Sequence, residues 1–287
     1  MSFIKSIKKS KEKILLYKLT ENILNKSVIP VDLFTENIHI CFIDVETTGA
    51  NRENDKIIEI ALKLVKVDKQ SGNIISFESL YESFQDPQEN ITNEITKITG
   101  ITDEMIKGHE INWDKVQLIF EKSDIILAHN AGFDRSFVDR YLPLSKNKIW
   151  ACSINDIDWL ERDFTKQGLE ILCFWHGFYY DSHRALNDVD ALIHLLCHNS
   201  YKINNPLSEL IENSKIPYYK MIARDSAFEM KDILKSNNYW WDGKNRYWWK
   251  RIDHSEIESE KKWLNEHIYH NYFKGIVEEI PITDKYK

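Results

Sequence analysis

Three long apolar segments follow one another in the first third of the chain, and they constrain its fold more than any other feature. Their sequences are IHICFIDV (38–45), KIIEIALKLVKV (56–67) and IISFESLYESF (74–84), and polar residues typical of turns separate them. Extended apolar runs joined in this way predict three consecutive antiparallel strands.

The next segments, up to about residue 200, alternate between patterns typical of helices and of strands. Strands are predicted at 124–130 and 148–154, and helices around 91–108, 113–123, 132–142, 153–161, 167–175 and 185–199. Strands first, then helix and strand in alternation, predict an α/β fold whose mixed sheet is flanked by helices.

The chain begins with a basic segment. Residues 1–20 hold six lysines and one glutamate, a local charge of +5 in a chain whose net charge is −7. Residues 3–26 are predicted to form an amphipathic helix. Two roles are open, contact with phosphate or a membrane surface, or simple docking of apolar side chains, and we favour docking. Those side chains are Ile4, Ile7, Ile14 and Leu15.

Pro206 and Pro217 bracket a predicted linker, 206–217, after which the pattern changes. Residues 218–287 show the order strand, helix, strand, strand, helix, strand, which predicts a small α+β module of the ferredoxin-like βαββαβ type. The expected organisation is therefore a basic N-terminal region (1–36), a main α/β domain (37–205), the linker and the C-terminal module.

Features that direct a chain to a membrane or out of the cell are not evident in the sequence. No run is long enough for a membrane span, and the basic start lacks the apolar core and cleavage site of a signal peptide. The four cysteines are scattered and include no CxxC pair, as is typical of reduced thiols. These features predict a cytoplasmic protein.

Two carboxylates interrupt the first apolar strand, within CFIDVETTG. Side chains alternate along a strand, so Asp44 and Glu46 point to the same face. A lone buried carboxylate is costly, so these two need a partner or a metal ion. Such pairs also occur on exposed strands. Whether Asp44 and Glu46 bind a metal ion therefore depends on whether the rest of the sequence supplies further ligands.

Two later segments supply further candidates. HNAGFD follows a buried strand and opens a helix whose first turn holds Asp134. HRALND places His183 five residues before Asp188, at the start of an amphipathic helix. Each aspartate borders the apolar face of its helix, whereas Asp190 is expected to face elsewhere. The alternative for Asp134 is that it only complements the helix dipole.

Four carboxylates and one histidine form a set suited to metal-assisted hydrolysis. Oxygen ligands favour Mg²⁺ or Mn²⁺ over zinc. Two such ions roughly 4 Å apart can activate water and stabilise the leaving oxygen of a phosphodiester. Imidazole titrates near neutral pH and suits the general base for that water. His194 and His198 form an i,i+4 pair that can also bind zinc, but no third ligand is evident.

The motifs FIDVETTG, HNAGFD and HRALND resemble those of the DEDDh family of 3′–5′ exonucleases, which includes the DNA polymerase III epsilon subunit, ribonuclease T and oligoribonuclease. The spacing of five residues from histidine to aspartate is that of the histidine branch, whereas the tyrosine branch places Tyr four residues before Asp. The segment ITGITDEMI also resembles the family's HGIT segment, with Thr99 where His is common. The resemblance covers about residues 37–200.

The resemblance implies an RNase H-like fold with a five-stranded mixed sheet. It implies hydrolysis from a 3′ end that releases nucleoside 5′-monophosphates, with His183 as the base. The implied ligands of two divalent ions are Asp44, Glu46, Asp134 and Asp188. The residues expected beside the terminal nucleotide are Thr47, Thr48, Asn130 and Phe133, although Phe133 can equally belong to the helix core.

The C-terminal module contains YWWDGKNRYWWKR (239–251), which predicts a hairpin around DGKN. An open face of this hairpin can stack unpaired bases on its aromatic side chains. Alternatively the tryptophans fill the core of the module, and we expect this for about half of them. The candidates for contact with nucleic acid are Trp240, Trp241, Trp248, Trp249 and Lys250. The module is also a candidate site for a protein partner.

The sequence therefore predicts a metal-dependent 3′–5′ exonuclease, with single-stranded DNA as the favoured substrate. One alternative is an exoribonuclease of the oligoribonuclease type that turns over RNA. Another is a non-catalytic protein that binds single strands or docks a partner. An endonuclease of the RNase H type is disfavoured by the spacing from histidine to aspartate. Sugar discrimination depends on pocket contacts that motifs do not reveal.

Overall fold

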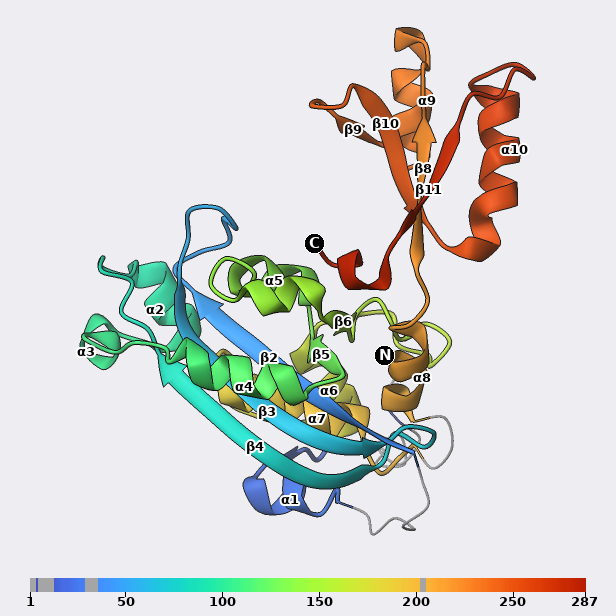
Figure 1. Ribbon diagram of the computed structural model, residues 1–287. Helices are drawn as coiled ribbons and strands as arrows, with labels where there is room; N and C mark the ends of the chain where they lie inside the picture. Colours follow the sequence, from blue (N-terminus) through green and yellow to red (C-terminus); the bar gives the residue numbers. More distant parts are fainter. Residues whose placement is uncertain (1–3, 5–12, 29–35, 202–204) are drawn as a thin grey trace. The chain divides into compact units, whose positions relative to one another are not determined.

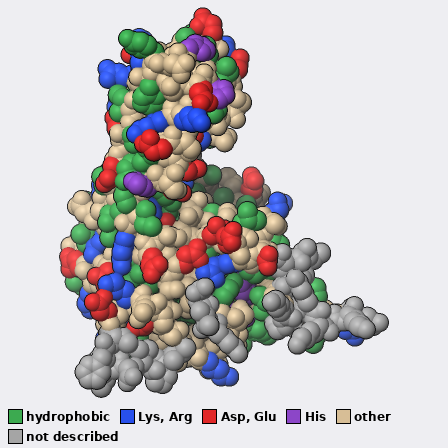
Figure 2. Space-filling view, turned by 90° about the vertical axis from the view of Figure 1, so that its right-hand side faces the viewer, with side chains coloured by type: hydrophobic (Ala, Val, Ile, Leu, Met, Phe, Trp, Pro, Cys, Tyr) green, Lys and Arg blue, Asp and Glu red, His purple; other side chains and the backbone are tan. Residues whose placement is uncertain are grey.

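The computed structural model describes residues 4, 13–28, 36–201 and 205–287. By its contacts the chain divides into two compact units. One unit comprises Met1–Ser214 with Tyr286–Lys287, and the other comprises Lys215–Lys285. Figure 2 shows acidic and basic side chains interspersed over the face that it draws, rather than gathered into separate regions.

The first unit is built on a five-stranded sheet with the order β4-β3-β2-β5-β6 (Figure 1). Its strands are β2 (Asn37–Thr47), β3 (Ile57–Asp68), β4 (Ile74–Phe84), β5 (Ile125–Ala128) and β6 (Ile149–Cys152). The first three pair antiparallel, and the last two join parallel to β2. The predicted mixed, RNase H-like sheet is therefore confirmed.

Helices cover both faces of this sheet, and Figure 1 shows α4 and α7 on opposite sides of it. The longer helices are α4 (Trp113–Lys122), α5 (Ala131–Val138), α6 (Leu169–His176), α7 (Ala185–Leu196) and α8 (Pro206–Asn213). The short ones are α1 (Glu21–Asn25), α2 (Asn93–Thr99) and α3 (Asp103–Ile106). Beyond β4 the strands and helices alternate as predicted, except over residues 153–161.

The face of β2 that meets α7 is the one that carries the carboxylates. Phe42 belongs to the same buried cluster as Val189 and Leu192 of α7. Because every second residue of a strand shares a face, Asp44 and Glu46 continue this row toward the end of β2. The apolar part of the row buries α7 against the sheet, and its acidic end lies beside the first turn of that helix.

The predicted N-terminal helix over 3–26 is wrong in the residues that the structure describes. β1 (Tyr17–Lys18) pairs parallel with β7 (Phe178–Tyr179), and α1 is the only helical part of 13–28. Pairing with a distant strand overrides the local helical pattern here. Ile4 packs against the main core, but Ile14 and Leu15 are exposed and do not dock. Ile7 lies outside the described residues.

Two further segments differ from the local patterns. The helix expected at 153–161 is absent from those described residues, which form turns. The Asp156 carboxylate accepts from the Cys152 N–H at 2.8 Å, and the indole of Trp159 donates to the Ser153 carbonyl at 2.6 Å. These bonds satisfy the backbone without a helix. The predicted linker, 206–217, holds α8, and Leu207 and Leu210 of this helix belong to the core of the first unit.

The second unit has the predicted order βαββαβ. Its elements are β8 (Tyr218–Ala223), α9 (Lys231–Ser236), β9 (Trp240–Asp242), β10 (Tyr247–Ile252), α10 (Ile257–His267) and β11 (Ile276–Ile280). All pairs are antiparallel, in the order β11-β8-β10-β9. Among the described residues, no helix in either unit is long and apolar enough to cross a membrane.

We expect the core beneath α7 to respond strongly to the loss of a ring. Phe42→Ala removes a fully buried side chain and should lower the free energy of unfolding of the first unit by about 3–5 kcal/mol. Leu118→Ala, on the exposed side of α4, is the matched control and should cost less than about 0.5 kcal/mol. Urea denaturation followed by circular dichroism measures both. Equal losses would contradict the core position of Phe42.

Candidate active site

The predicted metal ligands and the predicted base all line one cavity of about 330 Å³. Two parallel strands, β2 and β5, end at its edge, and α5 and α7 begin there. The carboxyl ends of parallel strands are the usual place for a ligand in α/β proteins. The lining includes Asp44, Glu46, His129, Asn130, Phe133, Asp134, Tyr180, His183 and Asp188.

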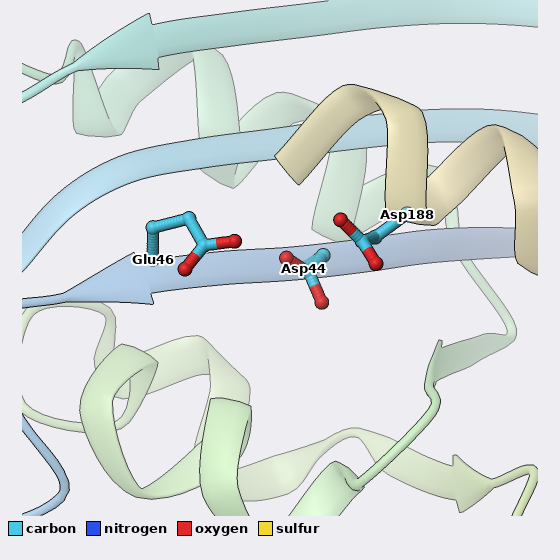
Figure 3. Close-up of side chains that lie close together, drawn as sticks. All are labelled: Asp44, Glu46 and Asp188. Carbon is cyan, nitrogen blue, oxygen red and sulfur yellow. The ribbon is translucent and has the colours of Figure 1, made fainter. Parts of the chain in front are cut away.

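Three of the carboxylates come close enough together to share a metal ion. Oxygen atoms of Asp44, Glu46 and Asp188 lie within 4.8 Å of one another. Figure 3 shows the first two rising from β2 and the third reaching toward them from α7. The motif of the first apolar strand and the motif that opens α7 therefore meet, as the resemblance implied.

Asp134 lies in the same cavity but is held differently. Its carboxylate accepts a hydrogen bond from the Val45 N–H at 3.1 Å, and the residue is 3% exposed. It is not part of the group of three within 4.8 Å that the described residues form. The bond fixes the start of α5 to β2 between Asp44 and Glu46.

Burial raises the pKa of the four candidate metal ligands in this cavity, and repulsion between carboxylates adds to the rise at Asp44, Glu46 and Asp134. Burial raises the pKa of Glu46 to about 8, and Asp188 and Glu59 add to the effect. Burial likewise raises the pKa of Asp134 to about 7. The pKa of Asp44 is well above its usual range because of burial and repulsion from Asp134 and Asp188. The charged forms therefore lack a compensating positive charge.

Asp188 has contacts that stabilise its charged form. Burial raises its pKa, while a hydrogen bond from the Tyr180 hydroxyl at 2.8 Å, the Arg184 N–H at 3.1 Å and the His183 imidazole oppose that rise. His183 itself has a φ of +62°, a left-handed conformation that costs about 1–3 kcal/mol in a non-glycine residue. The surrounding contacts have to hold it there.

Glu59 supplies such contacts, and the sequence reasoning missed it. Its carboxylate accepts from the Arg184 guanidinium at 2.8–3.2 Å and from the Ala185 N–H at 3.0 Å. These bonds fix the chain directly after His183 and hold the start of α7 to β3. The available signal was one acidic residue inside the apolar run KIIEIALKLVKV, the same kind of signal that singled out Asp44.

The other residues expected beside a nucleotide divide into two pairs. Asn130 and Phe133 line the cavity. Thr47 and Thr48 are not among its described lining residues, and their hydroxyls are engaged locally. The Thr47 hydroxyl donates to the Gly49 carbonyl at 2.6 Å, and that of Thr48 accepts from the Lys56 N–H at 3.0 Å. Their contact with substrate stays a prediction.

The histidine pair considered for zinc lies elsewhere. The nitrogens of His194 and His198 contact the Tyr17 hydroxyl at 2.8 and 3.1 Å. Burial lowers their pKa values to about 4 and about 3, so both are neutral. Among the described residues, the acidic cluster is the group whose ligand atoms are close enough for a metal ion. Asp190 faces away from that cluster and pairs with Lys63, as expected.

This donor set fits divalent cations. Four carboxylates repel one another in a buried cavity, and Arg184, whose charge acts on Glu46, is already paired with Glu59. Carboxylate oxygens are the ligands that Mg²⁺ and Mn²⁺ prefer. The mixed sheet and the Asp-Glu-Asp-Asp set with a histidine define the class of protein as a DEDDh-type nuclease.

Comparisons with known proteins agree with this class. Residues 41–196 match the family model RNase_T, described as "Exonuclease". This match spans more than half of the chain, so the chain belongs to the RNase T exonuclease family and carries a 3′–5′ exonuclease domain of the DEDDh type.

Two relatives are bacterial polymerases of much greater length. A DNA polymerase III PolC-type of Staphylococcus epidermidis is 29% identical over 211 residues, which are 70% of this chain and 14% of the relative. The PolC-type polymerase of Halalkalibacterium halodurans is 34% identical over 166 residues, or 53% of this chain and 11% of the relative.

Among solved structures, one similar chain is Exonuclease X in complex with 5′ overhanging duplex DNA. It is 21% identical with a TM-score of 0.42, and the match covers 60% of this chain and 99% of that one.

Without metal ions, the carboxyl groups should make the protein less stable as the pH rises. Ordinary carboxyl groups titrate near pH 4, but Glu46 does so at about 8 and Asp134 at about 7. Between these values the folded chain binds more protons than the unfolded chain, so the free energy of unfolding decreases with rising pH. We expect the melting temperature in EDTA to fall between about pH 5 and pH 8.

Two controls accompany this measurement. Glu46→Gln removes one titrating group and should flatten part of the fall. Adding Mg²⁺ should raise the melting temperature more at the alkaline end of the range, because the ion binds the deprotonated ligands. A melting temperature that does not change with pH in EDTA would contradict the raised pKa values.

Loss of Glu59 should impair the site without removing a ligand. Glu59→Ala frees Arg184 and the start of α7, and we expect nuclease activity or apparent Mg²⁺ affinity to fall roughly 10–100-fold, as for other groups that orient metal ligands. Glu78→Ala on the adjacent strand is the matched control and should leave both unchanged. Initial rates across a Mg²⁺ titration measure both variants. Unaltered rates in Glu59→Ala would show that His183 and Asp188 are held by other contacts.

Proposed function

We infer that this chain removes nucleotides from the 3′ end of single-stranded DNA in a reaction that depends on two divalent ions. The observation that carries the proposal is the meeting of Asp44, Glu46 and Asp188 within 4.8 Å in a cavity that also holds Asp134 and His183. A single-strand-binding or docking protein would not need this costly arrangement of buried charge.

The four carboxylates would hold the ions, Asp134 from its bond to β2 and Asp188 from its bond to Tyr180. Bound there, the ions supply positive charge for the phosphate and lower the pKa of water. His183 takes the proton from the attacking water at an imidazole nitrogen. The water oxygen forms a bond to phosphorus, the bond from phosphorus to the 3′ oxygen of the preceding nucleotide breaks, and that oxygen takes up a proton from solvent. The products are a nucleoside 5′-monophosphate and a strand shortened by one nucleotide.

Two cavity residues are suited to position the terminal nucleotide. The ring of Phe133 lies 5.0 Å from that of Phe137, and its own ring lines the cavity. It therefore presents a stacking surface for a base while the helix core fixes its position. Asn130 precedes α5 and offers an amide to sugar or phosphate.

DNA is the favoured substrate because the relatives named above are DNA polymerases. An RNA substrate is an outcome of the same test rather than a separate proposal. The test compares single-stranded DNA, duplex DNA, single-stranded RNA and dinucleotides, each labelled at the 5′ end, with Mg²⁺ or Mn²⁺. We expect a ladder that shortens from the 3′ end, with single-stranded DNA degraded fastest.

Variants of α7 and of the segment before it test the chemistry. Asp188→Asn removes a ligand charge, and His183→Gln removes the base, so each should lower the rate by about 10²–10⁴-fold. Asp190→Asn lies two residues from Asp188 but pairs with Lys63, and it should retain the wild-type rate. Initial rates on a single-stranded oligonucleotide measure all three variants. Shortening that persists in Asp188→Asn, or no shortening of any substrate by the wild type, would refute the proposal.

A further inference from the structure

The sheet of the second unit has one covered face and one open face. Leu234 of α9 and Leu264 of α10 pack against Met221, Trp248 and Ile252. Both helices therefore cover the same face of the sheet, as Figure 1 also shows. Since side chains alternate along a strand, the neighbours of these strand residues point to the other face, which neither α9 nor α10 covers. Ile222 and Tyr218 on that face are buried, so it is open mainly over β9 and β10.

This alternation divides the tryptophans of the hairpin into two pairs. Trp248 and Trp241 are opposite each other across β9 and β10 on the helix side, with ring centroids 5.5 Å apart. Trp249 and Trp240 are opposite each other on the open side. Trp240 is 69% exposed, although its side chain is among the largest apolar ones in the chain. Of these four tryptophans, Trp248 belongs to the buried cluster of the module, whereas Trp241 is 51% exposed, so the core takes fewer of them than the expected half.

The open face also presents cations beside its aromatic rings. The Lys220 ammonium lies 4.9 Å from the ring centroid of Trp249 and 4.7 Å from that of Tyr247, whose hydroxyl is 2.7 Å away. The Arg251 guanidinium lies 4.3 Å from the ring centroid of Tyr218. Among the described residues, neither cation forms a salt bridge, although hydrogen bonds in the hairpin turn and the charge of Lys220 together lower the pKa of Asp242.

This face also carries two acidic groups, as many as the two cations. Asp242 accepts from the N–H groups of Lys244 and Asn245 and so closes the hairpin turn. Glu278 lies on the edge strand β11, in register with Lys220. The face therefore combines flat aromatic rings with two cations and two acidic groups, of which Asp242 is engaged in the hairpin turn. Lys250, by contrast, lies on the helix side and pairs with Glu260 at 2.7 Å.

We propose that this open face, formed by Lys220, Trp240, Tyr247, Trp249 and Arg251, binds single-stranded nucleic acid at a site separate from the nuclease cavity. Exposed rings stack unpaired bases, and the two cations between them meet the phosphates of the same strand. Paired bases in a duplex offer no free faces for stacking, so a duplex is excluded as the main ligand. A protein partner would meet the same aromatic rings without needing the cations.

A circular single strand isolates this site because it has no 3′ end for the nuclease cavity. The full-length chain carrying Asp188→Asn is titrated in EDTA against a fluorescent circle of about 30 nucleotides, long enough for several stacked bases. Fluorescence anisotropy gives the dissociation constant. We expect the double variant Trp240→Ala, Trp249→Ala to weaken binding at least about tenfold, since each stacked base contributes substantially.

Trp241→Ala is the matched control, because this residue is also exposed and lies beside Trp240 but on the opposite face. It should leave the dissociation constant unchanged. Lys220→Ala with Arg251→Ala should weaken binding and reduce its dependence on salt. Circles of DNA and of RNA are compared to identify the preferred sugar, and a linear duplex of the same sequence should bind more weakly and not respond to the tryptophan variants.

A second assay separates binding at the open face from nuclease activity, so that either proposal can fail without the other. The chromogenic ester of thymidine 5′-monophosphate with p-nitrophenol occupies only the nuclease cavity, and its hydrolysis by the chain with intact Asp188 should not respond to the open-face variants. Failure of the circle to bind, or an equal loss in Trp241→Ala, would overturn the proposed face while leaving the nuclease proposal intact. Loss of ester hydrolysis in Trp240→Ala, Trp249→Ala would also overturn it.

Discussion

Repulsion among buried carboxylates is the constraint on which the rest of the first unit depends. Asp44 and Glu46 sit at the end of an apolar row, and Asp134 and Asp188 are brought to them by two helices. Such an arrangement costs free energy in the absence of cations, and the raised pKa values express that cost. The apolar contacts of α7 with the sheet have to outweigh it.

The main features of the site could be predicted from sequence because the chemistry demands particular residues at particular spacings. Asp44 and Glu46 share a face through the alternation of a strand, and His183 precedes Asp188 at the start of a helix. The supporting groups could not be predicted in this way. Glu59 acts through Arg184, 125 residues away, and such a pair becomes visible only when the two segments meet in the fold.

In the fold, too, the elements that depend on local sequence patterns were predicted, and those that depend on contacts between distant segments were not. The strands of the first sheet and the βαββαβ order of the second unit follow from runs of apolar residues and turns. The predicted N-terminal helix failed because Tyr17 pairs with Phe178, a contact that no local pattern contains. The faces of the hairpin in 239–251 were likewise set by the register across the turn, which joins Trp240 to Trp249 and Trp241 to Trp248.

The bond between Glu59 and Arg184 also fixes the charge of the nuclease cavity. Glu59 lies directly across the sheet from Glu46 on the same face, so without Arg184 the site would contain a fifth unneutralised carboxylate. With Glu59 neutralised, the four carboxylates carry at most four negative charges. That number equals the charge of the two divalent ions that we propose, so the occupied cavity would approach electrical neutrality before the phosphate arrives.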